Sequence, residues 1–218
     1  MGLFRIDGFL YRAMNKLVDA LGLSLLWLIT SLPLVTIGAS TAALYYTTHN
    51  VIRYDRGRVW PAYWKAFFGN FKQATPLWLL IVAFAYILGV NAHSAYMIYT
   101  AGNVSQWIFL VVLVPLALIL MWAIYLFPLM ARFQSTVRSL MKNSLLIAFR
   151  NIHWTILLMG MFVGSVYLVL VVPFAFVYIP EAYMFMSGWI LEPIFQKYMS
   201  PEDLAKEQQR NKSVMEDA

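Results

Sequence analysis

The feature that most constrains this chain is a run of 59 residues, between Lys72 and Arg132, without a single Asp, Glu, Lys or Arg. A helix that crosses a membrane needs about 20 consecutive apolar residues, so the run is long enough for two crossings and a short turn. We expect the crossings at Pro76–Tyr99 and Trp107–Met130, with the turn at Thr100–Gln106. Only 12% of the residues are charged, about half the fraction in a typical soluble domain.

Other charge-free runs predict further spans. The 30 residues before Glu181 contain one at Ile152–Val172, and the apolar run that ends at Arg53 contains another. A fifth, less apolar segment is Ala182–Met199. Lipid requires each segment to pair its own backbone groups, and no segment alternates as barrel strands do. We therefore predict an all-α, polytopic transmembrane helical bundle over residues 1–200, followed by a polar cytoplasmic tail at residues 201–218.

The first apolar run is interrupted by Pro33 and the residues up to Gly38, a signal that ends a helix. Thr36 or Ser40 could cap a second helix, Ala39–Ile52. Gly38 would then hold a backbone conformation that a side chain resists. The run is either one kinked span, which gives five spans in all, or a hairpin that enters and returns, which gives six.

The 16 Lys and Arg residues fall into four clusters: one before the first expected span, two in loops between spans and one in the tail. By the positive-inside rule, the Arg53–Lys72 loop, the Arg132–Arg150 loop and the tail are cytoplasmic. The turns near Gly102 and Pro180 carry no cations and lie outside. The N-terminus is inside with six spans and outside with five. The net charge of +6 is explained by anionic lipid headgroups, so we expect the lipid bilayer as a partner and no nucleic acid.

Aromatic residues in the first basic loop repeat at the spacing of an amphipathic helix, with Lys65 and Lys72 on its other side. They are Trp60, Trp64, Phe67, Phe68 and Phe71. Such a helix lies in the membrane interface, and either braces the bundle or docks a partner protein. A similar stripe follows in the second basic loop, at Phe133, Val137, Leu140, Met141 and Ala148.

Few residues have side chains that could take part in catalysis, bind a metal or line a path for a polar solute. Asn91, His93 and Glu192 could line a polar pathway, since ionisable groups inside spans are costly and often functional. Equally, His93 could be solvated, and Glu192 could extend to the cytoplasmic interface. His49 lies near a cationic loop end, where solvation is again the simpler explanation. The chain has no cysteine and no metalloprotease, serine-hydrolase or P-loop motif, so we expect no enzymatic activity, cofactor or metal.

Two blocks of sequence resemble the YesL-like family of bacterial membrane proteins. They are Leu32–Tyr46 (LPLVTIGASTAALYY) and Trp64–Thr75 (WKAFFGNFKQAT), in the order found in that family. Members are typically found beside carbohydrate-uptake ABC systems. The resemblance implies a multi-pass protein of the bacterial plasma membrane with an accessory or assembly role in sugar import, and it supplies no catalytic residues.

We therefore expect a non-enzymatic accessory subunit that contacts ABC transporter permease subunits. The alternatives are an independent small-solute transporter or channel and, further off, a membrane enzyme for lipid-linked sugars. Contact between this chain and carbohydrate is compatible with the resemblance, but no residue pattern in the sequence indicates it.

The distribution of cations predicts the result of cysteine labelling in this cysteine-free chain. Gly102→Cys reacts with an impermeant reagent from outside intact cells. Arg56→Cys, Ser139→Cys and Gln208→Cys react only after permeabilisation, because the positive-inside rule places them in the cytoplasm. Outside labelling at Arg56 or Ser139 would contradict the assignment.

Overall fold

The computed structural model describes residues 3–53, 58–100, 108–133 and 135–199, and residues 201, 202, 204, 205, 207 and 209 of the tail. Side chains are described from residue 14 onward, except at 108–110. The predicted turn at Thr100–Gln106 therefore lies outside the described residues apart from Thr100, and Trp107, Arg56 and Gln208 lie outside them too.

All regular structure in the described part of the chain is helical, which confirms the predicted class. The long helices are α1 (Leu3–Ser31), α2 (Ile37–Thr47), α3 (Val59–Thr100), α4 (Ile108–Arg132), α5 (Val137–Arg150), α6 (Ile152–Val171) and α7 (Ile179–Gln196). Three short helical segments join them: η1 (Leu34–Thr36), the π-helical turn η2 (Thr48–Arg53) and η3 (Pro173–Val177).

Three of the described helices contain stretches long and apolar enough to cross a membrane: Val59–Thr100, Val111–Arg132 and Ile152–Val171. A fourth candidate is the pair Met14–Ser31 and Leu34–Arg53, which is bent by 120° at its break. The predicted fifth segment forms α7, but α7 is not among these candidates. The membrane-protein class is thus supported by up to four spans, while a count of five or six stays a prediction.

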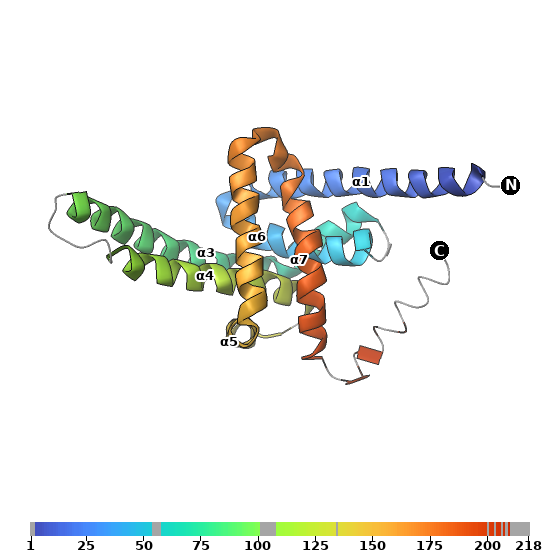
Figure 1. Cartoon of the computed structure of the whole chain (residues 1–218). Helices are drawn as coiled ribbons and strands as arrows, with labels where there is room; N and C mark the ends of the chain where they lie inside the picture. Colours follow the sequence, from blue (N-terminus) through green and yellow to red (C-terminus); the bar gives the residue numbers. More distant parts are fainter. Residues whose placement is uncertain are drawn as a thin grey trace.

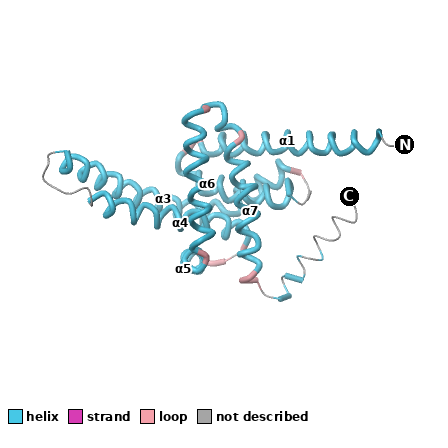
Figure 2. The backbone as a smooth tube through the Cα atoms, in the orientation of Figure 1, coloured by secondary structure: helices cyan, strands magenta, loops and turns pink. Residues whose placement is uncertain are grey.

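The long helices cross one another rather than lying parallel in one bundle. Figure 1 shows α3 and α4 side by side in a hairpin that extends away from the rest of the molecule, while α1 extends in the opposite direction. Helices α6 and α7 form a second hairpin that crosses the first (Figures 1 and 2). Helix α2 lies where these parts meet and contacts α1, α3, α4 and α7.

Helix α2 is buried because small residues cover much of its surface. Gly38, Ala39, Ser40, Ala42 and Ala43 are all buried, and small side chains let helix backbones approach closely. A Cβ atom added at Gly38 would lie 2.7 Å from Trp78 Cβ, 2.9 Å from Phe127 Cε1 and 3.0 Å from the Ala74 carbonyl oxygen. Gly38 is therefore the point at which α2 touches both α3 and α4.

The predicted break after the first apolar run is confirmed, but the predicted roles at the break are wrong. Neither Thr36 nor Ser40 caps α2: Ser40 Oγ donates to the Thr36 carbonyl oxygen at 3.0 Å. Thr36 Oγ1 lies within hydrogen-bond distance of the carbonyl oxygens of Thr30 and Pro33. The Thr36 hydroxyl thus contacts carbonyl oxygens at the end of α1 and in the break, and the Ser40 hydroxyl binds the carbonyl oxygen of the last residue of η1. Gly38 lies within α2, and what constrains it is lack of space, not a left-handed backbone.

The aromatic stripe and the second predicted span belong to one continuous helix. Helix α3 runs for 42 residues and passes through Pro76 without a break. The sequence had predicted two helices, at residues 60–71 and 76–99. In contrast, the second stripe from Val137 onward does form a separate helix, α5, whose buried face includes Leu140, Ile147 and Ala148, while Phe133 precedes this helix.

The contacts at Gly38 predict a large effect of added volume. Gly38→Val lowers the yield and melting temperature of purified protein, with a cost of about 1–3 kcal/mol or more, because Trp78 Cβ and the Ala74 backbone cannot move aside cheaply. Gly89→Val in α3 is the matched control, since nothing lies within 4 Å of a Cβ atom there. Equal tolerance at the two positions would contradict the packing of α2.

Candidate functional site

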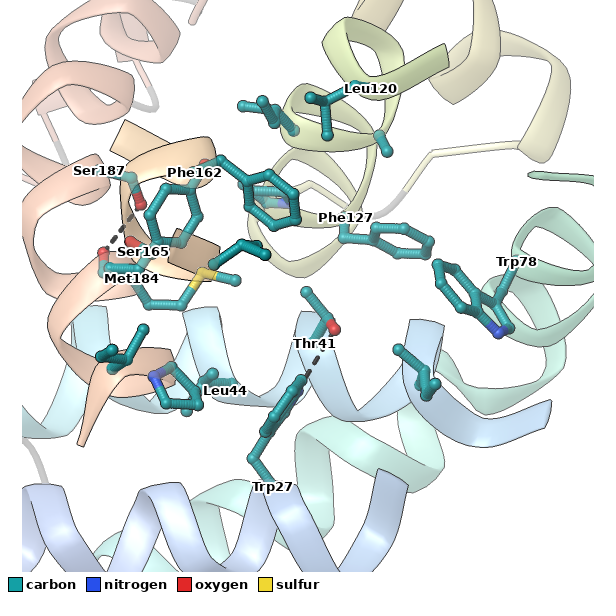
Figure 3. A pocket seen from close by; sticks show the side chains of 18 of the residues that line it. Trp27, Thr41, Leu44, Trp78, Leu120, Phe127, Phe162, Ser165, Met184 and Ser187 are labelled. Carbon is teal, nitrogen blue, oxygen red and sulfur yellow. Dashed lines mark hydrogen bonds between the residues drawn. The ribbon is translucent and has the colours of Figure 1, made fainter. Parts of the chain in front are cut away.

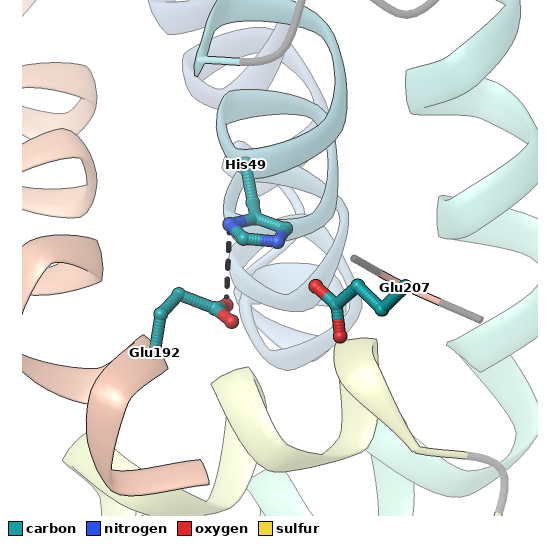
Figure 4. A group of neighbouring side chains, drawn as sticks. All are labelled: His49, Glu192 and Glu207. Atoms are coloured by element: carbon teal, nitrogen blue, oxygen red, sulfur yellow. Dashed lines mark ion pairs between the residues drawn. The ribbon is translucent and has the colours of Figure 1, made fainter. Parts of the chain in front are cut away.

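Four charged or titratable side chains meet inside the protein from segments far apart in the sequence. They are His49 of η2, Arg132 at the end of α4, Glu192 of α7 and Glu207 of the tail. Their side chains are at most 8% exposed. Figure 4 shows the imidazole of His49 and the two carboxylates directed toward a common centre.

The guanidinium of Arg132 connects the other three side chains. Its Nη2 atom lies 3.0 Å from Glu192 Oε2 and donates to both carboxylate oxygens of Glu207 at 2.6 Å. Its Nη1 atom lies 2.7 Å from His49 Nε2. Because a guanidinium can only donate, His49 Nε2 accepts, and the imidazole proton is on Nδ1. That nitrogen lies 3.2 Å from Glu192 Oε1.

Glu192 has a further hydrogen bond and a second cation nearby. The hydroxyl of Tyr45 donates to Glu192 Oε1 at 2.7 Å. Arg53, also in η2, places its guanidinium 4.3 Å above the ring of Trp189 in α7. Two carboxylates and two guanidinium groups are thus gathered around η2 and α7, which limits the cost of burying charge.

The same cluster meets the simplest requirement for a metal site. Ligand atoms of His49, Glu192 and Glu207 all lie within 4.8 Å of one another, and imidazole with two carboxylates is a plausible ligand set. However, Arg132 already binds both oxygens of Glu207 and lies against Glu192. A divalent ion would have to displace this guanidinium or be buried beside it. The residues therefore fit a network of ion pairs better than a metal site.

A second buried acid of α7, Glu181, also attaches this helix to η2. Thr48 of η2 donates to Glu181 Oε2 at 2.6 Å, and Glu181 is 4% exposed. Glu181 and Glu192 are 11 residues apart, about three helical turns, so they lie on one face of α7. The π-helical turn η2 contacts both acids. Such wide turns inside helices are frequent at functional sites.

The three residues of the predicted polar pathway do not come together. Asn91 and His93 are exposed on the projecting part of α3, and the Asn91 amide donates to the Ile87 carbonyl oxygen of its own helix. Glu192 is buried in the cluster around Arg132, not extended to an interface. The sequence did not indicate a role at this site for His49, Arg132 or Glu181. Two acids 11 residues apart in an otherwise charge-free stretch were the available signal.

The predicted partner-contact residues divide into inward and outward groups. Phe67 is buried and packs on Tyr63, while Trp64 and Phe71 are half-buried. Trp60 and Phe68 are 60% and 67% exposed. The rings of Trp64 and Phe68 are stacked, with centroids 5.6 Å apart. An aromatic surface is therefore held rigidly on the first turns of α3.

A large apolar cavity lies beside α2, with Ile37, Thr41 and Leu44 of that helix among its lining residues. Its volume is about 570 Å³, and none of its lining residues is charged. Figure 3 shows side chains from several helices around this space, among them Trp27, Trp78, Phe127 and Phe162.

The segment from the end of α1 to most of α3 resembles known sequences. Residues 21–92 match the family model "Protein of unknown function, DUF624". YesL-like proteins belong to that family. The match includes Gly38, His49 and the aromatic residues from Trp60 to Phe71. No curated protein and no solved structure matches the chain.

The ion-pair network predicts a large cost of removing its centre. Arg132→Leu lowers stability by about 3–5 kcal/mol, because Glu192 is left buried without its cation. Arg138→Leu, at an exposed position of α5, changes it by less than about 0.5 kcal/mol. The double variant Arg132→Leu/Glu192→Leu recovers part of the loss. Thermal unfolding in detergent measures all three, and equal melting temperatures for the two arginine variants would contradict the network.

Proposed function

We propose that this protein is a non-enzymatic accessory or assembly subunit of a carbohydrate ABC transporter in the bacterial plasma membrane. The observation that carries the proposal is the exposed aromatic surface at the start of α3, formed by Trp60, Trp64 and Phe68. It lies within the part of the chain that matches the family model. YesL-like proteins, which the sequence resembles, typically occur beside such transporters.

Two properties make this surface suitable for a protein partner. Aromatic side chains concentrate binding energy at interfaces, and Trp60 and Phe68 are more than half exposed. The surface is also preorganised, since Phe67 anchors the same helix turns in the core and Trp64 stacks on Phe68. Rigid side chains lose little conformational freedom on binding. We propose that permease subunits contact this surface from the cytoplasmic side of the membrane.

A second candidate function is an independent small-solute transporter or channel. It is favoured by the buried polar groups around η2, because ionisable side chains among apolar helices often mark a solute or ion path. The apolar cavity does not favour sugar as that solute, since its walls offer few groups that hydrogen-bond hydroxyls. Solute uptake into liposomes that contain only this chain distinguishes a transporter from an accessory subunit.

Co-purification from native membranes in mild detergent tests the accessory role. Trp64→Ala/Phe68→Ala reduces the recovery of permease chains about tenfold or more, the loss expected from truncating interface hot spots. Trp60→Ala acts in the same direction without removing a packed ring. Lys65→Ala/Lys72→Ala has a smaller effect, since cations at a lipid surface contribute about 1 kcal/mol each and are screened.

Phe84→Ala/Tyr86→Ala, at exposed aromatic positions further along α3, is the matched control. Membrane insertion of every variant is checked by fractionation. If the control pair loses the permease and Trp64→Ala/Phe68→Ala does not, the contact lies along the spans. If Trp64→Ala/Phe68→Ala fails to insert, the stripe is structural, and Trp60→Ala then decides whether it also binds.

A further inference from the structure

We propose that the cavity between α2 and the candidate spans is a binding site for the acyl chain of a membrane lipid. The cavity is lined by residues of α1, α2, α3, α4, α6, η3 and α7. With about 570 Å³ it lies within the range of pockets that hold small molecules, roughly 300–1,000 Å³.

The cavity walls favour an apolar ligand. The floor consists of buried side chains such as Leu44, Ile81 and Phe127. Of the four lining hydroxyls, that of Tyr183 is buried and has no hydrogen-bond partner among the described residues, while the other three are engaged. Ser165 Oγ donates to the Met161 carbonyl oxygen, and Thr41 Oγ1 accepts from Trp27 Nε1. Ser187 Oγ likewise donates within its own helix, to the Met184 carbonyl oxygen. With a single unpaired hydroxyl in the lining, a sugar or a charged solute would lose most of its hydration here with little replacement.

The cavity is continuous with surfaces that suit lipid. Three of its lining residues, Leu116 of α4, Val166 of α6 and Phe176 of η3, are nearly half exposed and form an apolar rim. The first two belong to candidate membrane spans. An apolar path therefore leads from the outward faces of these spans to the buried floor. Water does not fill apolar cavities readily, whereas the hydrocarbon of the bilayer is available at the rim.

The direct test uses the chain alone in phosphatidylcholine vesicles that contain phosphatidylcholine with a diazirine near the end of one acyl chain. After irradiation and digestion, mass spectrometry locates the lipid adducts. We expect adducts on the floor residues Leu44, Ile81 or Phe127, in addition to outward residues such as Leu170, which is 75% exposed. Adducts on outward residues alone would overturn the proposal.

Two neighbouring positions in α6 provide a matched pair of variants. Ser165→Phe places a ring in the cavity and lowers adducts on the floor residues about tenfold, the effect of displacing roughly two methylene groups. Gly164→Phe adds the same ring where nothing lies within 4 Å of a Cβ atom, and leaves the adducts unchanged. Labelling of Leu170 is the same in both variants.

Each remaining outcome is decisive. If Ser165→Phe does not insert, the adduct positions in the unaltered chain still decide the question. If Ser165→Phe and Gly164→Phe reduce the labelling of the floor residues equally, the reduction does not come from filling the cavity. That result would count against the site. If light scattering shows a dimer and the floor residues stay unlabelled, a second copy covers the cavity, and the proposal is wrong.

Discussion

The arrangement of the helices depends on the guanidinium of Arg132. It binds side chains of η2, α7 and the tail from the end of α4, so one buried cation connects four parts of the chain that are far apart in the sequence. Burying such a group is costly unless every neighbouring charge is compensated. The network therefore specifies how the α6–α7 hairpin meets α2 and α4, since a shift of α7 would separate Glu192 from Arg132, Tyr45 and His49 together.

The arrangement of the helices also depends on close packing around helix α2. Its small residues allow α3 and α4 to approach within van der Waals contact at Gly38, and its last turn leads directly into η2. The same short segment thus provides close packing at one end and polar contacts at the other. Small side chains and hydrogen bonds are the main sources of helix association in lipid, where apolar burial gives little advantage.

The sequence predicted well what depends on local composition. The charge-free runs located α4 and α6 to within a residue or two, and Pro33 marked the end of α1. It predicted poorly what depends on contacts between distant segments. In the sequence, His49 lies near a cationic loop end and Arg132 is one cation of a basic loop, so neither stands out. Only the contacts that both residues make with Glu192 in the folded chain reveal the network. Pro76 was taken as a boundary, yet prolines are tolerated within membrane helices because neighbouring groups satisfy the freed carbonyl.

The unbroken course of α3 has a mechanical consequence. With 42 residues at about 1.5 Å each, it is about 63 Å long, twice the roughly 30 Å thickness of the hydrocarbon layer. Its aromatic first turns and its apolar second half therefore belong to one unbroken helix. Helix α2 contacts α3 near its middle, at Ala74 and Trp78. A force applied to Trp60 or Phe68 is transmitted along the backbone to the apolar second half of the helix, because no loop lies between the two parts to absorb it.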